Sequence, residues 1–143
     1  MPPGIWRTSW KDGPAADRAV PGATVVVSVT EFVTHRPFGT PGVAAAGMRL
    51  RRSWPETPGA VGIRLWTDTG PRLSRSGSVT VWTDHEHLMR FVARPDHMRI
   101  ARTYRNRGVM RSATWETQLT TAPPLSPLWA SALRILTGAA PWT

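Results

Sequence analysis

The sequence predicts an α+β protein in which helices cover one antiparallel sheet. Two observations support this fold class. Segments rich in β-branched residues occur four times, and segments with apolar residues at helical spacing follow the first and the third of them. The resulting order is β-α-β-β-α-β with one further helix at the end, which is the order of a split βαβ unit.

The four strands are expected at residues 24–33, 60–68, 78–84 and 109–118. The first contains a run of valines, which is typical of a strand buried on both faces and therefore of a central position in the sheet. Turn residues rich in glycine and proline separate the strands from their neighbours.

The first helix is expected from about residue 43 to residue 54, where Pro55 and the turn residues after it end the pattern. Asp84 suits the N-cap of the second helix, because its carboxylate can accept hydrogen bonds from the free amides of the first turn. Pro95 interrupts that helix, so we expect a break there and a further segment from residue 95 to about 107. A short amphipathic helix is expected near residues 128–138.

A length of 143 residues suits one domain with its own core. We expect an irregular N-terminal arm at residues 1–22, the α+β domain at 23–120, and a C-terminal extension with the short helix at 121–143. Two helices cover only one face of a four-stranded sheet. We therefore expect two copies to pack sheet against sheet as a homodimer.

The composition excludes several classes of protein. The sequence has no cysteine, which excludes disulfides, thiolate metal centres, iron–sulfur clusters and a cysteine nucleophile. No run of apolar residues is long enough to span a membrane. The first residues lack the apolar core of a secretory signal, so we expect a cytoplasmic protein. No nucleophile elbow, phosphate-binding loop or dinucleotide fingerprint is present.

The chain is strongly basic, with a net charge of +9 that comes from seventeen arginines and one lysine. Seven of the arginines fall within residues 90–111. No helix-turn-helix, zinc-finger or RNA-binding signature accompanies them, so nucleic acid is not expected as a partner. A non-catalytic protein whose arginine-rich helix docks an acidic partner remains an alternative.

Three stretches in the middle of the chain resemble the dimeric α/β-barrel superfamily: MRLRRSWPETPGAVGIRLWTD, SGSVTVWTDHEHLMRFVARPDH and VMRSATWE. Within it they are most similar to antibiotic-biosynthesis-monooxygenase-like and spheroidene-monooxygenase-like proteins. The motifs that carry the resemblance are Arg51 and Arg52, Pro58 to Gly62, Val81 to Asp84, Leu88, Phe91, His97 and Trp115. They are scaffold motifs within residues 24–118, and they indicate the fold more than the chemistry.

The resemblance implies a ferredoxin-like protomer that dimerises, with a small-molecule cavity between sheet and helices. Members of the superfamily include cofactor-free oxygenases of aromatic polyketides, haem-binding proteins, cyclases and isomerases. We therefore expect no cofactor, with haem as the alternative.

His97 is the candidate catalytic residue. In a helix that starts at Pro95 it shares an apolar face with Ile100, Ala101 and Tyr104, while the arginines of that helix project elsewhere. A histidine that faces a pocket can act as a general base near neutral pH or as an axial haem ligand. The alternative is a core histidine whose ring is satisfied by one backbone carbonyl.

Candidate substrate-binding residues lie mostly on the strands. Arg64, flanked by apolar strand residues, could hold a phenolate, carboxylate or enolate. Trp66, Trp82 and Trp115 could form one hydrophobic wall for an aromatic substrate or a dimer seam, although simple packing is the alternative. His35, just after the first strand, could line the mouth of a cavity, and Tyr104 shares the face of His97.

Together these observations favour a small-molecule enzyme of secondary metabolism. We expect cofactor-independent oxygenation of a polycyclic aromatic, polyketide-like intermediate, in which His97 takes a phenolic or enolic proton and Arg64, Trp66 and Trp82 hold the anion. Cyclisation or isomerisation of a similar substrate needs the same proton abstraction and remains an alternative, as does a haem-dependent monooxygenase with His97 as axial ligand. No metal site is expected.

Overall fold

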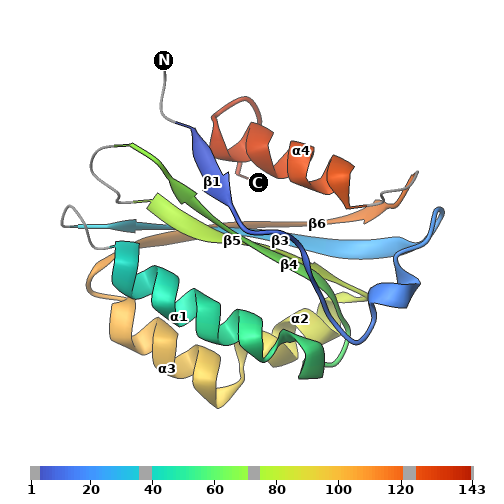
Figure 1. The fold of residues 1–143 in the computed structure, drawn as a ribbon, viewed down its shortest axis with the longest axis horizontal. Coiled ribbons are helices and arrows are strands. Elements are labelled where there is room, and N and C mark those ends of the chain that lie inside the picture. The colour runs from blue at the N-terminus through green and yellow to red at the C-terminus, as the bar shows by residue number, and fades with distance from the viewer. Residues whose placement is uncertain (1–3, 36–39, 71–74, 121–124, 143) are drawn as a thin grey trace.

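The computed structural model describes residues 4–35, 40–70, 75–120 and 125–142. It contains one antiparallel sheet with helices on both faces (Figure 1). The strands are β1 (Ile5–Arg7), β2 (Lys11–Asp12), β3 (Thr24–Thr34), β4 (Ala60–Asp68), β5 (Arg75–Trp82) and β6 (Gly108–Gln118). The α-helices are α1 (Thr40–Arg52), α2 (His85–Val92), α3 (Pro95–Tyr104) and α4 (Ser126–Leu136). The α+β, ferredoxin-like fold class is thus confirmed.

The sheet has the strand order β1-β4-β5-β3-β6, and β2 also pairs with β4. β3 is a central strand, as the run of valines predicts. Val27 pairs with Val81 of β5 on one side and with Trp115 of β6 on the other. Because side chains alternate along a strand, Val25, Val27 and Val29 all point to one face of the sheet.

Each face of the sheet has its own apolar core. On the face covered by α4, buried side chains of β3, β4 and β5 pack against Leu128, Ala132 and Leu136. On the opposite face, α1, α2 and α3 cover the sheet (Figure 1). The core there contains Val26, Trp54, Ala60, Ile63, Trp82, Leu88 and Phe91.

The position of α4 removes the reason given above for a homodimer. That expectation assumed that the second face of the sheet would lie bare. Instead α4 of the same chain covers it, and Val27 and Val79 on that face are fully buried within the single chain. Dimerisation therefore stays a prediction that rests on the resemblance alone.

The sequence suggested an irregular N-terminal arm, but two parts of this arm form short strands. Arg7 of β1 pairs with Trp66, and Lys11 of β2 pairs with Ile63, so both short strands extend the sheet along the free edge of β4. Strands of two and three residues are too short for an alternating pattern to be detected in the sequence. They form because the backbone groups of β4 would otherwise lack partners along this edge.

The local signals that end and begin the helices are confirmed. Asp84 is the N-cap of α2, and its Oδ1 accepts a hydrogen bond of 2.9 Å from the His87 amide. α2 ends at Val92, and α3 begins at Pro95. Within the described residues, no helix is both long and apolar enough to cross a membrane.

A buried carboxylate links three strands on the α4 face. Glu31 of β3 is 3% exposed and accepts hydrogen bonds from Arg75 of β5 and from Arg111 of β6 at 2.7 and 2.8 Å. A carboxylate this deeply buried needs such partners, because an unpaired charge in the interior is costly. Glu31 therefore serves the packing of the sheet.

Candidate active site

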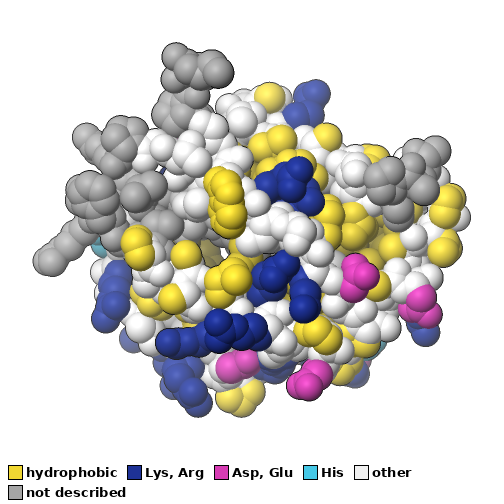
Figure 2. Space-filling view, viewed as in Figure 1, with side chains coloured by type: hydrophobic (Ala, Val, Ile, Leu, Met, Phe, Trp, Pro, Cys, Tyr) yellow, Lys and Arg dark blue, Asp and Glu magenta, His cyan; other side chains and the backbone are white. Residues whose placement is uncertain are grey.

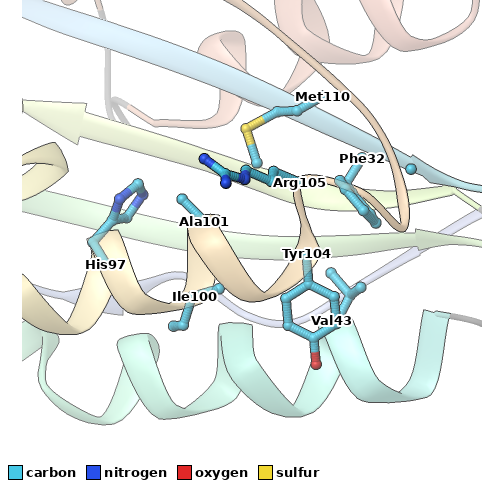
Figure 3. A pocket seen from close by; sticks show the side chains of 9 residues that line it. Phe32, Val43, His97, Ile100, Ala101, Tyr104, Arg105 and Met110 are labelled. Carbon is cyan, nitrogen blue, oxygen red and sulfur yellow. The ribbon is translucent and has the colours of Figure 1, made fainter.

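A cavity of about 250 Å³ lies between α3, α1 and the ends of β3 and β6 (Figure 3). It is on the face of the sheet opposite α4, where the resemblance implies a cavity. The residues that line it are Phe32, Val43, His97, Ile100, Ala101, Tyr104, Arg105, Gly108 and Met110. Its walls are mostly apolar, and the polar groups at its surface come chiefly from α3 and the residue after it.

α3 presents His97 to this cavity. Ile100, Ala101 and Tyr104 line the same cavity, so the shared face that the helical spacing predicts is confirmed. Figure 3 shows these side chains along one helix, with Tyr104 between α3 and α1. Its ring meets Phe32 edge-on, with the two centroids 6.1 Å apart.

The imidazole of His97 is half-buried and meets the Phe91 ring edge-on, at 5.2 Å between centroids. Its Nδ1 atom is buried and forms no hydrogen bond of ordinary geometry within the described part of the chain. Burial lowers the pKa of His97 below its usual range, and the positive charge of Arg94 lowers it further. The backbone of Val92 and the Asp96 carboxylate raise the pKa and offset part of this effect. The ring is therefore neutral at pH 7 and is able to accept a proton.

The lowered pKa of His97 predicts a pH dependence of stability. Below about pH 6.5 the unfolded chain binds a proton at this position more readily than the folded chain does, so the stability that the neutral ring contributes is lost as the pH falls. We expect the free energy of unfolding in urea to fall less steeply from about pH 7.5 to about pH 5.5 in His97→Gln than in the parent. Identical slopes in the two proteins would contradict the lowered pKa.

Arg94 and Asp96 fix the start of α3 and therefore the position of His97. The Arg94 guanidinium donates hydrogen bonds to Thr57 Oγ1 at 3.0 Å, to Ser53 Oγ at 3.1 Å and to Asp96 Oδ1 at 3.0 Å. Asp96 Oδ1 in turn accepts a bond of 2.8 Å from the His97 amide. The hydrogen bond from Arg94 lowers the pKa of Asp96, which keeps this carboxylate charged. Neither residue stands out as functional in the sequence, although Arg94 and Asp96 flank the predicted break at Pro95.

Arg105 is a cavity residue that the sequence analysis placed on another face. It lies just after the last residue of α3, and its long side chain extends along the cavity toward the end where His97 lies (Figure 3). Helical spacing alone describes where a side chain begins and not where a flexible one ends. The Arg105 guanidinium forms no hydrogen bond or ion pair with another described residue, and only the Arg105 amide is bonded, to the Ala101 carbonyl at 3.0 Å. A cation at an apolar cavity, with no acceptor for its side chain among the described residues, is suited to bind an anion.

The structure separates the other predicted binding residues from His97. Arg64 pairs with Val79 and Trp66 pairs with Gly77, which places Arg64 and Trp66 on the α4 face. Trp115 packs half-buried against the same core. The expectation that Arg64 and Trp66 act together with His97 and Trp82 is therefore wrong, because the sheet lies between them.

Trp82 faces the helices but does not reach the cavity. It is fully buried, packs edge-on against Trp54 at 4.9 Å between centroids, and lies 5.2 Å from Phe91. Its indole nitrogen donates to Thr80 Oγ1 at 2.9 Å. Trp82 thus supports Phe91, which in turn contacts the His97 ring. The single aromatic wall expected from Trp66, Trp82 and Trp115 does not form, because the three lie on two faces.

His35 is exposed at the end of β3 and is not among the residues that line the cavity. Its amide donates to the Arg107 carbonyl at 2.8 Å, so its backbone joins the two chain segments beside the cavity. Across the described ranges, no three acidic or histidine side chains come close enough to hold a metal ion.

No protein-family model and no curated protein sequence matches this chain. Solved structures do. SnoaB from Streptomyces nogalater, a cofactor-independent oxygenase, superposes with a TM-score of 0.56 at 23% identity, over 71% of this chain and 99% of SnoaB. Protein SO0527 from Shewanella oneidensis gives a TM-score of 0.58 at 14% identity, over 68% of this chain and 95% of that protein.

A conserved protein of unknown function from Bacteroides thetaiotaomicron is also similar, with a TM-score of 0.54 at 11% identity, over 67% of this chain and 99% of that protein. At these sequence identities, structural similarity indicates a shared fold and does not identify a substrate. SnoaB is an oxygenase, which agrees with the monooxygenase-like group that the sequence resembles. The chain therefore has the ferredoxin-like α+β fold of these proteins.

Proposed function

We propose that this chain is a small-molecule enzyme that oxygenates an enolisable aromatic compound, with His97 as the base and without a bound cofactor. The observation that carries this proposal is a half-buried imidazole, neutral at pH 7, at the wall of an apolar cavity. An imidazole of this kind is suited to general-base catalysis near neutral pH.

In the proposed reaction His97 takes the phenolic or enolic proton of the substrate. The resulting anion is stabilised by the Arg105 guanidinium, which also lines the cavity and has no carboxylate partner within the described residues. The electron-rich anion reacts with dioxygen as co-substrate. One oxygen atom becomes a ring carbonyl, and the other leaves as water with two hydrogen atoms of the substrate.

The size of the cavity bears on the substrate. At about 250 Å³ it is just below the range of roughly 300–1,000 Å³ that is usual for ligand pockets. It would enclose one or two fused rings, and the remaining rings of a polycyclic substrate would extend through the mouth. The reacting ring would then lie beside His97 and Ala101, with Phe32 and Tyr104 at the other end.

Haem is the alternative cofactor, and the proposed reaction does not need it. The macrocycle is larger than the cavity of about 250 Å³, so a haem on His97 would lie partly outside it. The proposed reaction therefore runs through the side chains alone. The likeness to SnoaB, an oxygenase that needs no cofactor, supports this choice.

The proposal predicts oxygen consumption with an enolisable tricyclic ketone such as anthrone. An oxygen electrode should record uptake that rises with protein concentration, and absorbance should show one quinone formed for each dioxygen consumed. Heat-denatured protein gives the background rate. Conversion of the ketone at the same rate under argon, without oxygen uptake, would favour a cyclase or isomerase and contradict the proposed oxygenation.

A further inference from the structure

Arg64 of β4 is a buried cation that has no acceptor among the described residues. Its side chain is 7% exposed, and its guanidinium carbon lies 4.6 Å from the ring centroid of Trp10 and 5.2 Å from that of Trp129. Its Nε atom is buried without a hydrogen-bond partner, and no ion pair joins Arg64 to any described residue. Two indole faces compensate part of the cost of burying this charge, and its Nε–H has no acceptor among the described residues.

A second cation lies beside the first. Arg7 of β1 pairs with Trp66, so it belongs to the same face of the sheet as Arg64, and its guanidinium carbon lies 5.8 Å from the Trp129 ring. Burial, and after it the charge of Arg7, lower the pKa of Arg64 to about 10. Arg64 therefore keeps its positive charge at neutral pH, and the like charges of the two guanidinium groups repel each other.

The described chain supplies no counter-ion for this pair. The two carboxylates deepest on the α4 face of the sheet are already bound elsewhere, since Glu31 and Asp68 both pair with Arg75. Asp12 of β2 is exposed and forms no ion pair within the described residues. An anion from solution would relieve the repulsion and satisfy the free donors.

The site can be approached from solvent at Arg7 and at the two indoles, while Arg64 itself is buried. Arg7 is exposed, and Trp10 and Trp129 are half-buried. Figure 2 shows Lys and Arg side chains set among hydrophobic ones on the face that β1 crosses. The N–H edge of a guanidinium matches the two oxygens of a carboxylate, and the Arg64 Nε–H is a donor without an acceptor among the described residues.

We propose that Arg64 and Arg7, flanked by Trp10 and Trp129, form a binding site for a small organic carboxylate on the α4 face, separate from the His97 cavity. The carboxylate binds the edge of the Arg64 guanidinium, and its apolar part lies against the exposed edges of the two indoles. The indoles favour an organic acid over inorganic phosphate, which is more strongly hydrated. The site is independent of the proposed oxygenation, because the sheet separates it from His97.

Titration of the full-length, isotope-labelled protein with sodium benzoate tests the site. The readout is the set of indole N–H signals in nitrogen–proton correlation spectra, assigned with Trp10→Phe and Trp129→Phe. We expect the Trp10 and Trp129 signals to shift and to saturate at millimolar benzoate. The Trp54 and Trp82 signals lie on the opposite face and should stay in place. Benzamide, which has the same shape and no charge, should cause no shift.

Arg64→Gln should weaken benzoate binding by at least about tenfold, since charge-assisted bonds are lost. Arg7→Gln, at an exposed position that folding tolerates, should weaken it less. Arg90→Gln removes an exposed charge elsewhere and should leave it unchanged. Unchanged affinity in both Arg64→Gln and Arg7→Gln, equal binding of benzamide or inorganic phosphate, or shifts confined to Trp54 and Trp82 would each overturn the proposal.

Discussion

Replacing His97 by glutamine is expected to lower the turnover of an enolisable ketone by about a hundredfold, because general-base catalysis usually contributes a factor of this order or more. Glutamine keeps a polar side chain of similar length, so the variant should fold. Its amide cannot accept the substrate proton. The loss should therefore be in kcat and not in KM, since the apolar walls that bind the substrate are unchanged.

Arg99→Gln is the matched control for His97→Gln. Arg99 is exposed on the same helix, and its removal should leave both kinetic constants within about twofold of the parent, as for most surface substitutions. The parent should also lose activity as the pH falls through the lowered pKa of His97, because the ring becomes protonated. If His97→Gln keeps the activity and the pH profile of the parent, His97 is a core residue and the assignment of the base is wrong.

Truncating Trp82 to alanine is expected to cost about 3–5 kcal/mol of folding free energy, which is the usual range for a large aromatic residue in a core. Trp82 is fully buried and touches both Trp54 and Phe91, so the cavity left behind cannot close without disturbing a three-ring cluster. The melting temperature should fall by roughly 10 °C in a chain of this length. Equilibrium unfolding in urea measures the free energy directly.

Trp6→Ala provides the comparison, because Trp6 is 58% exposed and its removal should change stability by less than about 0.5 kcal/mol. Trp82→Phe should lie between the two, since it keeps a ring in the cluster and loses the hydrogen bond to Thr80. A Trp82→Ala variant as stable as the parent but unable to bind substrate would restore Trp82 as a binding residue.

The sequence predicted well what depends on neighbours in the chain. Asp84 at the N-cap, the break at Pro95 and the common face of His97 and Tyr104 all follow from spacing within one helix. Helical geometry fixes these relations without knowledge of the rest of the fold.

Which residues of neighbouring strands share a face of the sheet could not be predicted from spacing within one element. The alternation within β4 correctly grouped Arg64 with Trp66, but the face that this group shares with β5 is set by the strand register. That register pairs Arg64 with Val79 and Trp66 with Gly77, which puts them on the face of β5 opposite Trp82. A shift of one residue exchanges the two faces of a strand. Trp82 and Trp66 therefore seemed to form one wall, although they lie on opposite sides of the sheet.

The position of β3 also has a consequence for the order in which the protein folds. It is the first long strand to be synthesised, yet it lies between β5 and β6, and its register with β6 joins Thr24 to Gln118. The ribosome must therefore release nearly the whole chain before β3 has both neighbours. Pairings this distant in sequence slow folding. The valines of β3 consequently stay exposed to chaperones and to other nascent chains until β6 and then α4 are in place.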